Sequence, residues 1–225
     1  MKLIHNAFEI VMDFQNGIPN TLVVESPECM RLLIIHFQSQ ISGGQGGFVL
    51  SDSKMKELSL SKEAEFILDP FIHPEHNKVF STKLIQHIRT LAHNENHFEE
   101  TAEIEGLLLQ YAASLMQDVE ESINFSDSLD TLALLKTLGF MFDFEDMSPI
   151  ENIITYIKAC NKYLKKRLFV FVNLKTFFTT EEILYLYESL QGMRAYMLLL
   201  ENKVYNLFSS NEKCSIIDVD YCEIF

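Results

Sequence analysis

The chain has 225 residues, is 48% hydrophobic and carries a formal net charge of −14. This length and hydrophobic fraction predict a folded domain with a core and exclude a disordered tail. The charge excludes a protein that is basic overall, so any contact with nucleic acid must come from a local cluster of cations.

Four scattered cysteines without a CxxC pair are typical of a reduced protein and argue against a zinc knuckle. Glu9 and Asp13 stand where a signal peptide would be apolar, and the apolar runs are too short to span a bilayer. We therefore expect a soluble cytoplasmic protein without a membrane partner.

A strand followed at once by a helix is the first predicted unit. Residues 21–25 form an apolar run, after which Ser26 offers an N-cap and Pro27 takes the first helical position. The glycine-rich stretch 43–47 should end this helix. A P-loop at this place would need the pattern GxxxxGK[ST], but residues 25–28 hold two carboxylates and neither glycine nor lysine. ATP hydrolysis is therefore not expected.

Two more strands and a long helical region follow. Residues 48–50 and 65–69 read as strands, with a basic loop that contains Lys54 and Lys56 between them. Apolar residues at helical spacing then predict helix over 81–122, in two stripes separated by a polar segment. This is long for helices that serve one compact sheet, so we expect an arm that projects or packs against a partner.

Helix boundaries are well marked in the next part of the chain. A helix is predicted over 127–138, with Asp127 as N-cap and Gly139 in the C′ position. Ser148, followed by Pro149 and by a glutamate three residues after the serine, forms a capping box that opens another helix.

The last part alternates strands and helices. Residues 168–172 predict a strand, a helix begins at Thr179 and stops at Gly192, and further strands are expected at 196–200 and 216–219. Because the strands are continuous apolar runs, they predict a mostly parallel sheet that is covered on both faces. The fold class is thus α/β, with a head domain at residues 1–80 and 140–225 and a helical extension at 81–139.

No side chains form a recognisable catalytic motif, so no enzyme activity is expected. His73 and His76 lie in a polar turn, and His93 and His97 would share a helix face, as metal ligands can. No third ligand is set by the sequence, and solvated histidines are the favoured interpretation.

Acidic residues gather around the end of the long helical region. Several converging carboxylates suit calcium. The alternative is that Asp127 caps a helix while the other acids are solvated. The acidic residues are Asp118, Glu120, Glu121, Asp127 and Asp130.

A basic cluster lies between the capping box and the strand at 168–172. Five cations occur within ten residues that include no acid, and three of them, spaced by four and three residues, would lie on one helix sector. A helix C-terminus also favours cations through its dipole, which remains the alternative explanation. The cluster consists of Lys158, Lys162, Lys165, Lys166 and Arg167.

Ordered similarity along the chain identifies a family. The similarity extends from about residue 48 to residue 220 and is densest at 131–139, 148–173, 177–183 and 196–202. These segments resemble the short form of the CRISPR-associated Csn-two family, the accessory protein of type II-A adaptation.

This resemblance implies both a fold and a function. The implied fold is a P-loop-like head without the nucleotide site, with a long helical extension. The implied function is a non-enzymatic homotetrameric ring that threads onto double-stranded DNA ends without sequence preference during spacer acquisition, beside the integrase pair and the effector nuclease. The ring is implied to be stabilised by calcium.

The sequence departs from the family at the implied calcium site. Phe125 and Ser128 stand where carboxylates are expected and Asp127 matches, so the remaining candidate ligands are Glu120, Glu121 and Asp130. Lys136, Lys54 and Lys56 are candidates for lining the hole alongside the basic cluster. A scaffold that docks the other adaptation proteins, with incidental DNA contact, is the alternative function.

Overall fold

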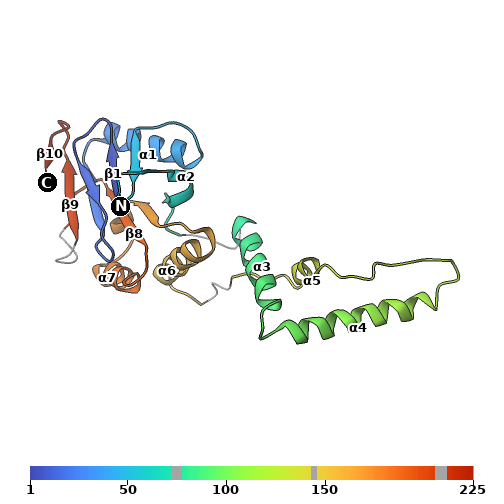
Figure 1. The fold of residues 1–225 in the computed structure, drawn as a ribbon. Coiled ribbons are helices and arrows are strands. Elements are labelled where there is room, and N and C mark those ends of the chain that lie inside the picture. The colour runs from blue at the N-terminus through green and yellow to red at the C-terminus, as the bar shows by residue number, and fades with distance from the viewer. Residues whose placement is uncertain (72–77, 143–145, 206–211, 225) are drawn as a thin grey trace. The chain divides into compact units, whose positions relative to one another are not determined.

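A computed structural model describes residues 1–71, 78–142, 146–205 and 212–224 (Figure 1). The chain divides into two compact units. The head unit consists of Met1–Ile72 and Phe144–Phe225, and the helical unit is His73–Asp143. The predicted helical extension, 81–139, lies within the second of these units.

A six-stranded sheet forms the centre of the head unit. Its order is β10-β9-β3-β8-β7-β6, and every neighbouring pair is parallel except β10 with β9. A mixed α/β fold with a mostly parallel sheet was predicted, and the structure confirms it. The strands are β3 (Asn20–Val24), β6 (Ala64–Ile67), β7 (Leu168–Val172), β8 (Tyr196–Glu201), β9 (Lys213–Ile217) and β10 (Glu223–Ile224).

Both faces of this sheet are covered, which explains why its strands read as continuous apolar runs. Leu168 and Val170 of β7 belong to a core with helix α1 (Pro27–Ile41). The alternate residues Phe169 and Phe171 are equally buried. They point to the opposite face, where α6 (Pro149–Ala159) and α7 (Thr180–Ser189) pack (Figure 1).

A second, antiparallel sheet packs on the α1 side and was not predicted. Its order is β2-β1-β4-β5. His5 of β1 is buried, and its Nε2 lies 2.8 Å from Nδ1 of His36 in α1. Burial lowers the pKa of His5 to about 4, with a smaller contribution from the charge of His36. The strands are β1 (Lys2–His5), β2 (Val11–Asp13), β4 (Phe48–Ser51) and β5 (Glu57–Leu58).

Local capping signals place the helices of the head unit as predicted. The Ser26 side chain accepts a hydrogen bond from the Cys29 amide at the start of α1. Full capping boxes open α6 at Ser148 and α7 at Thr179. The shorter helical segments of this unit are α2 (Leu60–Glu63), the π-helical turn η2 (Cys160–Leu164) and the 3-10 turn η3 (Leu174–Thr176).

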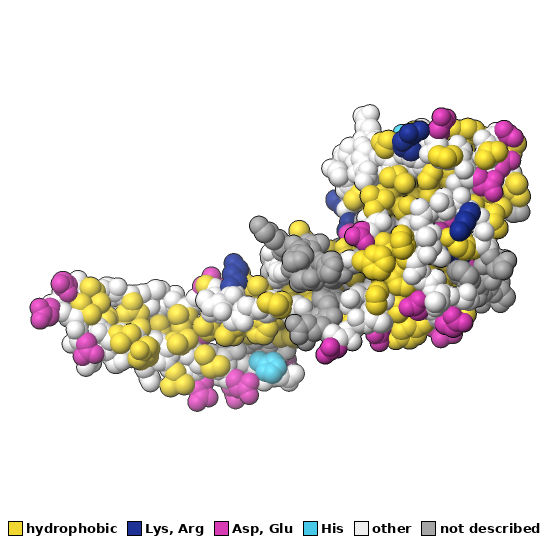
Figure 2. All heavy atoms as spheres, turned by 180° about the vertical axis from the view of Figure 1, so that it is seen from behind, with side chains coloured by type: hydrophobic (Ala, Val, Ile, Leu, Met, Phe, Trp, Pro, Cys, Tyr) yellow, Lys and Arg dark blue, Asp and Glu magenta, His cyan; other side chains and the backbone are white. Residues whose placement is uncertain are grey.

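The helical unit contains α3 (Lys78–Ala92), α4 (Phe98–Met116) and α5 (Thr131–Thr137). Among its described residues, Phe80 is the one hydrophobic side chain that is buried, and α4 buries none. The Thr131 hydroxyl donates to a Glu105 carboxylate oxygen at 2.6 Å, which links α5 to α4. This unit therefore exposes most of its apolar side chains (Figure 2).

Three predicted boundaries were wrong. Helix α5 begins at Thr131, because the side chain of Asp130, and not that of Asp127, accepts the hydrogen bond of the first turn. Helix α4 ends at Met116 rather than near residue 122. Strand β9 begins at Lys213, where pairing with β3 starts, although its first residues are not apolar.

Candidate nucleic-acid interface

The basic cluster begins on α6 but does not continue as a regular helix. After α6 the chain forms the wider turn of η2, and Lys165 follows with a φ of 60°. The prediction that Lys158, Lys162 and Lys165 share one α-helical sector was therefore wrong for Lys165. All three side chains are exposed, so each can meet a phosphate group.

Lys166 has a structural role within the head unit. Its Nζ donates to the backbone carbonyls of Ser61 and Ala64, at 2.7 Å each, and lies 3.9 Å from a Glu65 carboxylate oxygen. The side chain is only 13% exposed. A buried carbonyl without a partner costs free energy, so this lysine stabilises the junction of α2, β6 and β7.

Arg167 is held by an ion pair. Its Nε donates to Oε2 of Glu63 at 2.7 Å, and its backbone N–H donates to the Glu63 carbonyl at 2.7 Å. The hydrogen bond that Arg167 donates to Glu63 is the main cause that raises the pKa of Arg167. Glu63 uses one N–H of a guanidinium group that has five, so the group keeps further donors for an anion.

A surface pocket of about 450 Å³ opens beside Arg167. The Asn161 side chain amide donates to the backbone carbonyls of Lys166, at 2.8 Å, and Arg194, at 3.2 Å. This amide therefore ties together the chain segments that precede β7 and β8. The pocket is lined by Glu63, Asn161, Lys165, Arg167 and Arg194.

The second basic loop is ordered by an aspartate. Oδ1 of Asp52 accepts from the amides of Lys54 and Lys56, at 2.8 and 2.9 Å, and Met55 at the tip has a φ of 61°. The Lys56 amide is the main cause that lowers the pKa of Asp52. The charge of Asp52 also raises the pKa of Arg167, which places this loop near the pocket. Both lysine side chains are exposed.

Lys136 lies in the other unit. It is exposed in the last turn of α5, within the helical unit. The pocket, by contrast, belongs entirely to the head unit.

The acidic residues predicted to bind calcium are exposed and do not converge. Oδ1 of Asp130 accepts from the Leu132 amide at 2.9 Å, so this carboxylate caps α5. Across the described ranges, no group of three or more His, Cys, Asp or Glu side chains is placed to hold a metal ion. This concerns all of the candidate ligands, which are Asp118, Glu120, Glu121, Asp127 and Asp130.

The histidine pair predicted to share a helix face does not do so. His93 follows the end of α3, and His97 is the residue before α4, with its Nδ1 3.3 Å from a Glu100 carboxylate oxygen. The other pair, His73 and His76, lies outside the described residues.

A buried charged group near the carboxyl ends of β7 and β8 was not predicted. Lys175 forms a buried ion pair with Glu212, whose carboxylate also accepts from the Thr21 hydroxyl. Glu201, which ends β8, accepts from the Lys175 amide at 3.0 Å. Burial raises the pKa of Glu201 to about 7, and the charge of Glu212 adds to this rise.

This group occupies the edge at which open α/β sheets commonly bind ligands. Its lysine is neutralised by a buried carboxylate, so the arrangement offers no free cation to a nucleotide phosphate. The sequence signal for it was a glutamate at the end of an otherwise apolar strand, in the run YMLLLE at residues 196–201.

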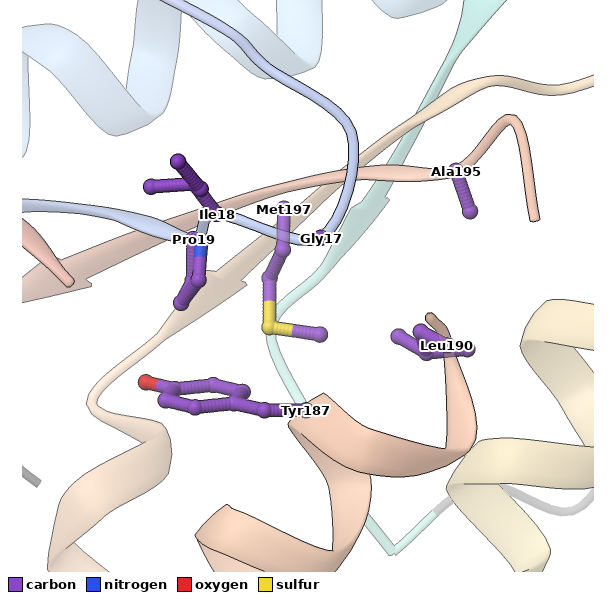
Figure 3. Close-up of a pocket in the computed structure, with 7 residues that line it drawn as sticks. All are labelled: Gly17, Ile18, Pro19, Tyr187, Leu190, Ala195 and Met197. Atoms are coloured by element: carbon purple, nitrogen blue, oxygen red, sulfur yellow. The ribbon is translucent and has the colours of Figure 1, made fainter. Parts of the chain in front are cut away.

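A small cavity lies between α7 and the start of β8 (Figure 3). Tyr187 of α7 and Leu190, the residue after this helix, face Met197 across the cavity, and the turn that contains Gly17 closes it. Its volume of about 20 Å³ is close to that of one water molecule, and its lining is mainly apolar. We therefore assign it to packing and not to ligand binding.

None of the helices in the described ranges combines the length and the hydropathy that crossing a bilayer requires.

The surface feature of the head unit that is suited to nucleic acid is a group of exposed cations at the amino-terminal edge of β6, β7 and β8. Such a surface can hold phosphate oxygens through charge-assisted hydrogen bonds.

Comparison with known proteins gives two similarities. The family described as CRISPR-associated protein (Cas_Csn2), the Csn-two family of the resemblance above, matches residues 40–221. A curated relative, the CRISPR-associated protein Csn2 of Streptococcus agalactiae, is 28% identical over 134 residues. That alignment covers 56% of this chain and 58% of the relative, so the chain spans less than two thirds of the relative's length.

Proposed function

Because this chain belongs to the CRISPR-associated Csn2 family, we propose that it is a non-enzymatic clamp on double-stranded DNA. In this proposal the protein holds duplex ends during the acquisition of new spacers. It would act in the cytoplasm, beside the CRISPR integrase pair and the type II effector nuclease.

The observation that carries the proposal is the group of exposed cations at one edge of the sheet. The chain has 32 acidic residues against 18 lysines and arginines, so a surface with the average composition of this chain would repel DNA. Lys165, Arg167 and Arg194 line the pocket, and Lys158 and Lys162 are exposed on the segment that leads into it. Neutralisation of phosphates supplies most of the affinity in non-specific DNA binding, and it grows with the number of contacts.

The exposed apolar face of the helical unit supports an oligomer. Ile104, Leu108, Tyr111 and Leu115 recur at helical spacing on α4, and each is exposed in the single chain. Apolar patches of this extent mark interaction surfaces, so we propose that α4 forms part of an arm that packs against other copies. A homotetrameric ring would repeat the cations of the head unit around one hole.

Two finer points complete the proposal. The head would be a P-loop-like fold that has lost its nucleotide site, since Glu25 in the loop after β3 and Glu28 in the first turn of α1 stand where phosphates would bind. Calcium would act at the assembled ring, with carboxylates such as Glu120, Glu121 and Asp127 brought together by neighbouring copies.

A gel-shift comparison tests the clamp. The native protein, with its mass in solution determined, is mixed with a linear duplex or with a closed circle of the same sequence. A threading ring should shift the linear duplex and leave the circle unbound. Equal binding of both would contradict threading. Parallel lanes with calcium and with a chelator show whether the metal is needed.

A scaffold for other adaptation proteins is the second candidate, and the same apolar face of α4 favours it. The double charge reversal Lys158→Glu and Lys162→Glu separates the two functions, because both side chains are exposed and make no core contact. If spacer acquisition survives in cells while DNA binding is lost, the scaffold explains the protein better than the clamp does.

A further inference from the structure

The pocket beside Arg167 is built from segments that precede three adjacent strands. Glu63 stands just before β6, Arg167 just before β7, and Arg194 two residues before β8. Backbone hydrogen bonds join the segments, since the Arg167 amide donates to the Glu63 carbonyl and the Tyr196 amide donates to the Arg167 carbonyl, both at 2.7 Å. The pocket walls are thus extensions of the sheet.

The side chain of Asn161 adds hydrogen bonds that hold two segments of the pocket together. Its amide donates to the carbonyls of Lys166 and Arg194. Arg194 is part of the cationic lining, and Lys166 is adjacent in the chain to two of its residues. A site whose supporting groups are already hydrogen-bonded loses little entropy when it binds a ligand.

The charges of the lining indicate the ligand class. Lys165, Arg167 and Arg194 give three positive charges and Glu63 gives one negative charge, which leaves a net charge of +2. A phosphate monoester carries about −1.5 to −2 at pH 7, because its second pKa is about 6. A phosphodiester inside a DNA strand carries only one negative charge.

The shape of the site agrees with this class. The site is a surface hollow of about 450 Å³ in which cations from two segments meet, since Lys165 and Arg167 precede β7 and Arg194 precedes β8. Arg167 is oriented by the Glu63 hydrogen bond at Nε, and a guanidinium group oriented in this way is suited to bidentate contact with phosphate oxygens.

We propose that this pocket binds a phosphate monoester and that the monoester is the terminal 5′-phosphate of a DNA end. The second part rests on the proposed function as a DNA clamp. Lys165, Arg167 and Arg194 would contact the phosphate oxygens, Asn161 and Glu63 would position them, and the other exposed lysines would hold the adjoining strand.

The test compares two linear duplexes of the same sequence, one with 5′-phosphate and one with 5′-hydroxyl ends. Affinity is measured by fluorescence anisotropy on the native protein. We expect the phosphorylated duplex to bind about tenfold more tightly, which corresponds to one good charge-assisted contact. Arg194→Ala removes one cation and should weaken binding of both duplexes, but it should bring the ratio of their affinities close to one.

Lys158→Ala is the matched control, because Lys158 is an exposed cation outside the pocket lining. It should weaken binding of both duplexes alike and keep their ratio. Equal affinity of the wild-type protein for the two duplexes would overturn the assignment to DNA ends, while the clamp itself would stand.

A titration with inorganic phosphate tests the pocket without DNA. Calorimetry should detect binding to the wild-type protein and a clear loss of it in Arg194→Ala. Phosphate binding without any preference for 5′-phosphate ends would assign the pocket to a free phosphate ligand and overturn the DNA-end proposal. If the protein binds neither duplex but still binds phosphate, the clamp fails and the phosphate pocket survives. Absence of phosphate binding together with equal duplex affinities would overturn the pocket altogether.

Discussion

Neighbouring lysines of the basic cluster have different roles at the residue scale. Lys162 is exposed, and its Nζ lies 5.0 Å from the centre of the Tyr163 ring. Lys166, four residues later, is directed at the carbonyls of Ser61 and Ala64. Composition and spacing cannot separate these roles, because the partners of Lys166 lie about a hundred residues away in the sequence.

Substituting these two lysines should therefore affect different properties, stability for Lys166 and DNA binding for Lys162. Lys166→Ala removes two charge-assisted hydrogen bonds and should lower the free energy of unfolding by about 3 kcal/mol. Lys162→Ala should change it by less than about 0.5 kcal/mol and weaken DNA binding instead. Urea denaturation measures the first effect and anisotropy the second. A Lys166→Ala protein as stable as the wild type would contradict the structural role.

The buried carboxyl of Glu201 predicts a dependence of stability on pH. Its pKa is raised from 4.5 to about 7 by burial, so the folded state binds a proton that the unfolded state releases near pH 4.5. The stabilisation from this proton is present below pH 4.5 and is lost as the pH rises through 7. The loss should be on the order of 3 kcal/mol.

Thermal denaturation at several pH values measures this loss. Glu201→Gln should flatten the pH dependence between about 4.5 and 7, because a neutral amide cannot release the proton. Glu188→Gln is the control, since Glu188 is exposed on α7 and the change should leave the pH profile as it is. An unchanged profile in Glu201→Gln would contradict the role of Glu201 in the pH dependence.

Elements marked by local signals were predictable from the sequence. The capping boxes at Ser148 and Thr179 and the apolar run of β7 involve residues within a few positions of one another, and the structure confirms them. The start of α5 was not predictable, because Asp127 and Asp130 are both good N-caps. Of the antiparallel sheet, the strand at 48–50 was predicted and is β4, whereas β1, β2 and β5 were missed, because strands of two to four residues leave no clear period in the sequence.

At the scale of the α4 element, we predict that its apolar stripe mediates assembly. Leu107→Asp places a charge on a side chain that is 58% exposed in the single chain, so the fold of the subunit should tolerate it. In an oligomer the same charge would be buried, and association should weaken at least tenfold. Sedimentation velocity over a concentration series measures this change.

Ala113→Asp is the matched control for this experiment, because residue 113 lies on the opposite side of α4 from Ile104. It introduces the same charge and should leave the oligomer intact. A wild-type protein that remains monomeric at micromolar concentration would contradict the role of the stripe in self-assembly and would favour the scaffold.

At the scale of the whole molecule, two of the five residues that line the pocket, Lys165 and Arg167, could be read from the sequence, because they belong to a cluster in the chain. Glu63 and Arg194 were missed, because the parallel sheet brings their segments, about a hundred and about thirty residues away, beside Arg167. Asn161 was missed because its role depends on the carbonyls that its amide contacts. Sheet register, and not composition, creates this pocket.

The salt dependence of DNA binding reports how many copies of this surface act together. Each neutralised phosphate lowers the logarithm of the affinity by about 0.9 for each tenfold rise in salt. The head unit offers the two arginines of the pocket and five predicted lysines that are exposed, so one copy, with these seven cations, accounts for a slope no steeper than about −6.3. The five lysines are Lys54, Lys56, Lys158, Lys162 and Lys165.

A ring of several copies should therefore give a steeper slope than this limit, measured by anisotropy between about 50 and 200 mM salt. In Leu107→Asp, with association weakened, the slope should fall back below it. The substitution itself removes none of the seven cations, because Leu107 lies on the helical unit and all of them lie on the head unit. A shallow slope in the wild-type protein would mean that one subunit binds the DNA alone. The net charge of −14 would then repel the duplex, because no other copies would add cations at the binding surface.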